Sequence, residues 1–193
     1  ADAIIPIEAC SVDGTSLTLN QPSKPHFIRN CGENIKEGSI GLEQGSYLSP
    51  QSISMCATMG YDHIPVARKL KIGIISTGDE LKSPGEDLSF GEIYESNSYG
   101  LSGLVKSLGH IPIRYPSVVD SLDDLRTQFN QAAAECDLFL TSGGVSMGEW
   151  DFVRKLMEEE GKVAFWRVRI RPGSPPLFGH WNDTPMFGLP GNP

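Results

Sequence analysis

Two kinds of hydrophobic pattern alternate along the chain from residue 69 onward. Short apolar runs of strand length occur at residues 70–76, 110–115, 137–141, 163–169 and 184–189. Between them, apolar residues recur every three or four positions, which is the spacing of an amphipathic helix. Strands that alternate with helices are typical of βαβ units around a parallel sheet. The pattern therefore predicts a three-layer α/β/α domain with a mostly parallel sheet.

Three helices are predicted between these strands. The first ends at Gly109 and carries four apolar residues on one face: Leu101, Leu104, Val105 and Leu108. The second begins at Ser121, a residue type that caps helix N-termini, and is expected to bury Leu125, Phe129 and Ala133. The third runs from about residue 150 to residue 160 and ends at Gly161.

The residues before this region show other sequence patterns. Residues 1–31 contain short alternating stretches between turn residues, which predict a β-rich segment too small to form a core alone, and so the end of something larger. Residues 32–68 contain spaced glycines and one short helix, with Ser49 as N-cap, Pro50 in the first turn and Gly60 after the end. We therefore expect a β-rich remnant (1–31), a linker-domain segment (32–68) and an α/β domain (69–193).

Composition narrows the functional classes. The formal net charge of -8 argues against broad contact with nucleic-acid phosphates. No apolar run approaches the about 20 residues that span a bilayer, and the N-terminus lacks the basic flank of a signal peptide, so no membrane association and a cytoplasmic location are expected. Neither a Cys-x-x-Cys nor a His-Glu-x-x-His pattern is present, so any metal is expected to be a hard cation bound by oxygen.

Polar and glycine-rich segments follow the predicted strands where each strand ends. They lie at residues 76–81, 116–120, 142–151, 167–175 and 189–193. Because ligands of open parallel sheets bind beyond the carboxyl ends of the strands, these segments are expected to meet at one edge.

The residue types in these segments suit a phosphorylated ligand. Glycines after Ser142 can offer backbone N–H groups to an anion at low steric cost. Carboxylates of the kind that hold Mg²⁺ beside a phosphate are Asp79, Glu80, Asp120 and Asp151. Arginines that would share one face of an extended strand, and could clamp an oxyanion, are Arg167, Arg169 and Arg171.

Each feature also has a structural interpretation. A Ser-Gly-Gly turn is often an ordinary strand-to-helix connection, Asp79 and Asp120 could stabilise turns, and Asp151 could cap its helix. The arginines could form a solvated strand edge. Coincidence at successive strand ends favours an enzyme site for a phosphorylated small molecule. Neither Gly-x-x-x-x-Gly-Lys nor Gly-x-Gly-x-x-Gly occurs, which argues against a P-loop and a dinucleotide site.

Five motifs, in order, resemble the molybdopterin molybdenumtransferases, the family that includes the C-terminal domain of gephyrin. They are Ser76-Thr-Gly-Asp-Glu-Leu81, Gly91-Glu-Ile-Tyr-Glu-Ser-Asn97, Ser142-Gly-Gly-Val-Ser-Met-Gly-Glu-Trp-Asp151, Arg171-Pro-Gly-Ser-Pro175 and Leu189-Pro-Gly-Asn-Pro193. Upstream, Ala1-Asp-Ala-Ile-Ile and Arg29-Asn-Cys-Gly-Glu-Asn-Ile35 resemble that family's inserted domain and linker. The resemblance covers nearly the whole chain.

The resemblance implies Mg²⁺-dependent insertion of molybdate into adenylylated molybdopterin, with release of AMP. It implies catalytic roles for Glu80, Asp120 and Asp151, and a metal site formed by Asp79, Asp120 and Asp151. The substrate-binding residues that it implies are Thr77, Gly78, Ser142, Gly143, Gly144, Ser146, Arg167, Arg171, Pro172 and Ser174. A homodimer is expected, with an adenylyltransferase or a molybdoenzyme as a further candidate partner.

Three positions depart from the family pattern. Asn34 stands where the linker motif usually has an acid, Arg171 replaces a lysine, and Ser174 replaces a frequent second lysine. These changes leave metal and phosphate binding expected and make molybdate binding the weaker expectation. The chain is also expected to be a fragment of a protein about twice its length. Alternative functions are a molybdopterin adenylyltransferase or a non-catalytic, gephyrin-like scaffold.

Overall fold

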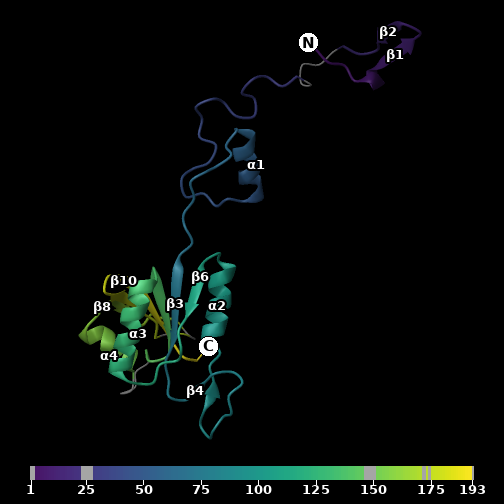
Figure 1. Ribbon diagram of the computed structural model, residues 1–193. Coiled ribbons are helices and arrows are strands. Elements are labelled where there is room, and N and C mark those ends of the chain that lie inside the picture. The colour runs from purple at the N-terminus through teal and green to yellow at the C-terminus, as the bar shows by residue number, and fades with distance from the viewer. Residues whose placement is uncertain (1–2, 23–27, 146–150, 171–172, 174, 193) are drawn as a thin grey trace. The chain divides into compact units, whose positions relative to one another are not determined.

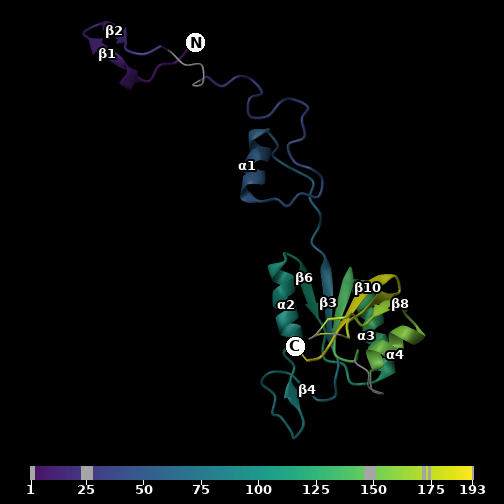
Figure 2. The same cartoon turned by 180° about the vertical axis from the view of Figure 1, so that it is seen from behind.

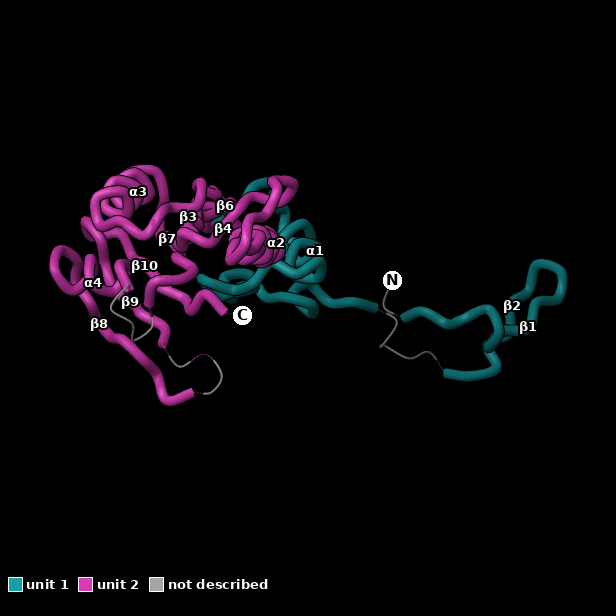
Figure 3. Tube along the Cα trace, turned by 90° about the horizontal axis from the view of Figure 1, so that it is seen from below, with its two compact units in different colours: residues 1–66 teal, residues 67–193 magenta. Residues whose placement is uncertain are grey.

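The computed structural model describes residues 3–22, 28–145, 151–170, 173 and 175–192. The chain divides into two compact units, Ala1–Val66 and Ala67–Pro193 (Figure 3). The finer predicted division, at residues 31 and 68, stays a prediction.

The first unit contains little regular structure. A 3-10 helix η1 (Ile7–Ala9) precedes an antiparallel hairpin of β1 (Cys10–Asp13) and β2 (Ser16–Leu19). The predicted helix is present as α1 (Pro50–Thr58), where the Ser49 side chain accepts a hydrogen bond from the Ser52 N–H at 3.1 Å. The N-cap prediction is therefore confirmed.

The second unit is built around a six-stranded sheet (Figure 1). Its strands are β3 (Lys71–Ser76), β6 (Ile111–Arg114), β7 (Leu138–Ser142), β8 (Lys162–Trp166), β9 (Leu177–Trp181) and β10 (Thr184–Leu189), in the order β6-β3-β7-β10-β9-β8. Strands β6, β3, β7 and β10 are mutually parallel, and β9 runs antiparallel to both of its neighbours. The short strands β4 (Leu81–Lys82) and β5 (Ile93–Tyr94) form a separate parallel pair.

Helices cover both faces of the large sheet (Figures 1 and 2). Helix α2 (Asn97–Ser107) packs on β3 and β6, whereas α3 (Leu122–Glu135) and α4 (Phe152–Glu159) pack on the other face. Ser121 caps α3 by accepting a hydrogen bond from the Asp124 N–H at 3.4 Å. The predicted three-layer α/β/α architecture with a mostly parallel sheet is confirmed.

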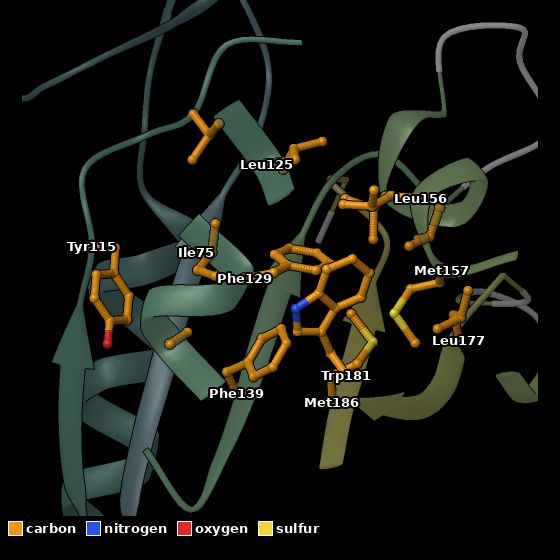
Figure 4. Packing of buried hydrophobic residues seen from close by; sticks show 14 of the residues in the cluster. Ile75, Tyr115, Leu125, Phe129, Phe139, Leu156, Met157, Leu177, Trp181 and Met186 are labelled. Atoms are coloured by element: carbon orange, nitrogen blue, oxygen red, sulfur yellow. The ribbon is translucent and has the colours of Figure 1, made fainter. Parts of the chain in front are cut away.

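Aromatic side chains form the centre of the larger hydrophobic cluster, between the sheet and α3 (Figure 4). The Phe129 ring lies 5.1 Å from Phe139 and 5.5 Å from Trp181, the latter edge-on. Such pairs contribute roughly 0.5–1.5 kcal/mol each beyond the area that they bury. Leu125 and Phe129 are buried as predicted, whereas Ala133 packs against the cluster only partly buried. The cluster fixes α3 on the sheet.

Two features of the elements differ from the predictions. On the predicted apolar face of α2, Val105 is buried and Leu101 packs against the smaller hydrophobic cluster, whereas Leu104 and Leu108 are 56% and 65% exposed. The helix also buries Ser98 and Ser102. Strand β9 was not predicted. Its sequence, with a glycine and a histidine, breaks the apolar run, and the Asn182-Asp183 turn that joins it to β10 has φ values of 47° and 63°.

The predicted strand at residues 163–169 is also too long. Strand β8 ends at Trp166, and Arg167 has a φ of 71°, in the left-handed region. The extended backbone therefore does not continue through Arg167 and Arg169, and a shared arginine face on one strand is not what the structure shows.

Candidate active site

A cavity of about 560 Å³ lies beyond the carboxyl ends of β3 and β7. Its walls are the loops that follow β3, β7 and β10, together with the starts of α2 and α4. Among the residues that line it are Thr77, Gly78, Glu80, Asp120, Ser142 and Asp151. Residues from all five predicted strand-end segments line this cavity, so the segments meet at one edge of the sheet, as expected for a parallel α/β domain.

The loop after β3 is shaped by Gly78. Its φ is 149°, and a Cβ atom there would lie 2.5 Å from Oε2 of Glu80. Thr77 continues the parallel pairing beyond β3 as an isolated bridge to Val118, and its N–H donates to the Ser142 carbonyl at 3.1 Å. The backbone of this loop is therefore held against both neighbouring strand ends.

The glycines after β7 are required by their surroundings. Gly143 has a φ of 101°, and a Cβ atom would lie 2.6 Å from the Thr77 carbonyl oxygen. Gly144 has a φ of 64°, and a Cβ atom would lie 2.9 Å from Val153 Cγ2. The Gly143 N–H donates to the Leu189 carbonyl at 3.0 Å, so this group is engaged within the protein and is not the anion donor.

The carboxylates of the cavity are electrostatically coupled. Thr77 Oγ1 donates to Asp120 Oδ1 at 2.7 Å, and the Asp120 N–H donates to Asp79 Oδ1 at 2.9 Å. Burial raises the pKa of the Asp120 carboxyl and the Thr77 hydrogen bond opposes this, while the charges of Asp79, Glu80 and Asp151 raise it further. A cation placed among these groups would relieve their repulsion.

Capping of a helix, the structural role considered for Asp151, does not account for this residue. It occupies the N-cap position of α4, but its side chain makes no capping hydrogen bond. Its Oδ2 atom is buried and has no hydrogen-bond partner among the residues that the structure describes. A buried carboxylate oxygen without a partner is costly, and Asp151 lines the cavity, so the group is available to a ligand there.

Glu95 was not predicted as a site residue, although the second motif contains it. Glu95 is 5% exposed and lines the cavity. Its carboxylate accepts hydrogen bonds from Ser76 Oγ at 2.9 Å, the Ser98 N–H at 2.7 Å and Ser98 Oγ at 2.6 Å, and lies 3.9 Å from Arg114 Nη2. An acid directly before a helix start was the available signal. Glu95 ties the start of α2 to the end of β3.

Asn97 was missed in the same way. Its Nδ2 donates to Ser142 Oγ and to the Gly191 carbonyl, both at 2.7 Å. It therefore joins the start of α2 to the loops after β7 and β10.

The sequence and the fold of this domain can be compared with those of known proteins. Residues 73–193 match the protein family described as "Probable molybdopterin binding domain". The chain belongs to this family.

Individual relatives of this molybdopterin-binding domain agree. The chain is 39% identical, over 195 residues, to a protein of Haemophilus influenzae named molybdopterin molybdenumtransferase, and the match covers 100% of this chain but 48% of the relative. The chain thus spans about half the length of the relatives that it matches. The resemblance to molybdopterin molybdenumtransferases inferred from the motifs is confirmed.

Solved structures give the same result. A molybdopterin biosynthesis moeA protein from Pyrococcus horikoshii matches with a TM-score of 0.77 and 29% identity, over 100% of this chain and 48% of that one. The molybdopterin biosynthesis enzyme MoaB from Thermus thermophilus has a TM-score of 0.50 at 19% identity, over 64% of this chain and 82% of that one. The second comparison shows a shared fold only.

The molybdopterin-binding domain brings most of the predicted site residues together. Those that line the cavity are Thr77, Gly78, Glu80, Asp120, Ser142, Gly143, Gly144 and Asp151. Asp79 is next to the cavity, because its Oδ1 accepts a hydrogen bond from the N–H of the lining residue Asp120. Arg167 follows β8, with its guanidinium carbon 5.6 Å from the centre of the Trp166 ring, and is not among the described lining residues. Ser146, Arg171, Pro172 and Ser174 lie outside the described residues.

The donor set of the cavity fits a hard cation that is shared with a ligand. Across residues 3–22, 28–145, 151–170, 173 and 175–192, no group of three or more His, Cys, Asp or Glu side chains is arranged to enclose a metal ion. Mg²⁺, however, is usually held by one or two carboxylates, waters and substrate phosphates rather than by an all-protein cage. The unpartnered Asp151 oxygen and the coupled Asp120 carboxyl fit that mode of binding.

Membrane-spanning helices are absent from the described part of the chain. None of the helices there has the length and apolar character needed to cross a bilayer.

Proposed function

We propose that this chain is the molybdopterin-binding part of a molybdopterin molybdenumtransferase, acting in molybdenum cofactor biosynthesis. The proposed reaction converts adenylylated molybdopterin and molybdate into the molybdenum cofactor and AMP, in the presence of Mg²⁺. The observation that carries the proposal is the position of Asp151. Asp151 lines a cavity that also contains Glu80 and Asp120, and one of its oxygens is buried with no hydrogen-bond partner among the described residues. The relatives of this domain bear the name of this enzyme.

The acidic residues of the cavity would form the metal site. Asp120 and Asp151, with Asp79 beside them, would hold Mg²⁺ against the substrate phosphates. Bound there, the cation would offset phosphate charge while the bond to AMP breaks. Thr77 orients the Asp120 carboxyl through its 2.7 Å hydrogen bond. Burial and the neighbouring acids raise the pKa of Asp120, and a cation bound beside it would offset the charges of those acids.

Glu80 and the glycine loop would position the substrate. Glu80 lies at the turn that Gly78 permits, and its carboxylate lines the same cavity. Ser142 and Gly144 border the cavity at the end of the neighbouring strand β7, and would contact the pterin phosphate or the nucleotide. The predicted roles of Ser146, Arg167, Arg171, Pro172 and Ser174 toward molybdate and phosphate belong to the same proposal and rest on the resemblance alone.

The direct test uses the full-length protein. It is incubated with adenylylated molybdopterin, Mg²⁺ and molybdate, and AMP is quantified by chromatography. Molybdate-dependent AMP release is the expected result. Formation of adenylylated molybdopterin from ATP and molybdopterin would instead identify an adenylyltransferase. Absence of both reactions would favour the non-catalytic scaffold. The oligomeric state, expected to be a homodimer, is measured by light scattering on the same sample.

A further inference from the structure

Asn97 lies where three loops of the candidate site meet. It is the first residue of α2, and it lines the carboxylate cavity and a neighbouring cavity of about 680 Å³. That second cavity has a largely apolar lining that includes Leu101, Pro175 and Pro190. Ser142 also borders both cavities. Asn97 and Ser142 therefore lie between the carboxylate-lined cavity and the apolar one.

The orientation of the Asn97 amide follows from its partners. The Gly191 carbonyl oxygen can only accept a hydrogen bond, so the NH₂ group of Asn97, and not its oxygen, must face it. The same NH₂ group donates its second hydrogen to Ser142 Oγ. Both amide hydrogens are thus committed to the two loops.

The backbone that carries Asn97 is held in place independently. Glu95 accepts hydrogen bonds from Ser76 Oγ and from the N–H and hydroxyl of Ser98. These bonds fix the first turn of α2 relative to the end of β3. Asn97 therefore projects from a rigid support, which is the requirement for positioning another group accurately.

Accepting from Asn97 constrains the hydroxyl of Ser142. With its oxygen engaged as acceptor, the Ser142 hydroxyl hydrogen is left to donate elsewhere. Among the described residues, no acceptor for that hydrogen is found, although Ser142 is only 4% exposed. The residue borders the cavity, so a ligand oxygen is the available acceptor.

The two loops that Asn97 joins are already close together. The Gly143 N–H donates to the Leu189 carbonyl at 3.0 Å, and a Cβ atom on Gly191 would lie 3.5 Å from Gly143 Cα. The Asn97 amide therefore bridges two loops that the backbone already holds together.

We infer that Asn97 is a positioning residue that makes the Ser142 hydroxyl a dedicated hydrogen-bond donor to an anionic oxygen of the substrate. The inference rests on the proposed function. It adds to that function the residue that fixes the Ser142 hydroxyl as a hydrogen-bond donor. Asn97 acts through Ser142, and the two residues form one functional unit.

The test is a double-mutant cycle in the full-length protein, with Asn97→Ala, Ser142→Ala and the double variant. Because each single variant weakens or removes a hydrogen bond to a charged group, each should raise the KM for adenylylated molybdopterin by about 10-fold or more. Because the bond is made in ground state and transition state alike, kcat should change little. The double variant should be no worse than Ser142→Ala alone.

Asn130→Ala is the matched control. Asn130 also makes two side-chain hydrogen bonds, from Trp181 Nε1 at 2.9 Å and from Asn182 Nδ2 at 3.0 Å, but it lies on α3 away from the cavity. This variant should lower the melting temperature and leave KM unchanged. Additive KM effects of Asn97→Ala and Ser142→Ala, or an unchanged KM in Asn97→Ala, would overturn the inference.

A binding measurement separates this inference from the proposed function. Adenylylated molybdopterin is titrated by calorimetry into the same variants without molybdate, so that no turnover is needed. If the wild type binds but releases no AMP, the proposed reaction is wrong, and the cycle in Kd still decides the role of Asn97. If the wild type neither binds nor turns over, both are overturned.

Discussion

At the scale of single residues, the candidate site is defined by carboxyl groups that are costly to place together. Asp120 is half-buried beside three other acids, and within the described part of the chain a buried oxygen of Asp151 has no partner. Such an arrangement opposes folding and is usually retained for function, because removing it tends to stabilise a protein and to abolish its activity. The sequence indicated the residue types but not this conflict.

Asp120→Asn tests the conflict directly. The folded-state pKa of Asp120 is raised, so its ionised form destabilises the folded protein. This penalty is absent below the unfolded pKa of about 3.9 and develops as the pH rises through the folded pKa. The amide that the substitution introduces would keep the Thr77 hydrogen bond and carry no charge.

We therefore expect Asp120→Asn to melt at a higher temperature than wild type at pH 7, with the difference disappearing near pH 4. AMP release should fall by at least about 100-fold, the usual range for an acid–base or metal-binding group. Asp183→Ala is the control, since this carboxylate is 86% exposed and pairs with the exposed Lys162, away from the cavity. Equal melting temperatures of wild type and Asp120→Asn at pH 7 would argue against the electrostatic coupling.

At the scale of elements, hydrophobic periodicity and capping predicted most of the fold. The strands at β3, β6, β7 and β10 and the N-caps at Ser49 and Ser121 were predicted from local patterns, and the structure confirms them. Strand β9 was missed because its apolar residues alternate around Gly179 and His180. Its hairpin with β10 depends on a two-residue turn at Asn182 and Asp183, both in the left-handed region. Asn and Asp are residue types that favour such hairpin turns, so this pair was the available signal in the sequence.

The loop between β7 and α4 provides an element-scale prediction. Gly143→Ala places a Cβ atom 2.6 Å from a backbone oxygen at a φ of 101°, so it should destabilise the domain by roughly 1–3 kcal/mol. Gly103→Ala is the matched control, because Gly103 lies within α2 with nothing within 4 Å of its Cβ position. That change should stabilise by roughly 0.5–1 kcal/mol. Denaturant titrations measure both, and equal midpoints would contradict the loop geometry.

At the scale of the whole molecule, catalysis should depend on Mg²⁺ through Asp151. Chelation by EDTA should stop AMP release by the full-length wild type, and excess Mg²⁺ should restore it. Mg²⁺ together with AMP should also raise the melting temperature of the wild type, because ligands that bind only the folded state stabilise it.

Asp151→Asn should lose both the turnover and the Mg²⁺-dependent shift, since an amide has no charge to attract the cation. The melting temperature without Mg²⁺ shows whether this variant is folded. A full Mg²⁺-dependent shift in Asp151→Asn would remove this residue from the metal site.

By itself, the sequence determined the class of the fold, the family and the kinds of chemical group at the strand ends. These follow from local properties: hydrophobic period, turn residues, caps and contiguous motifs. Only the tertiary structure decided which of those groups meet. Thr77 and Asp120 are 43 positions apart, yet they share a 2.7 Å hydrogen bond because β3 pairs with its neighbours in one particular register. The engagement of the Gly143 N–H and the unpartnered Asp151 oxygen likewise depend on packing between distant segments, which no local pattern encodes.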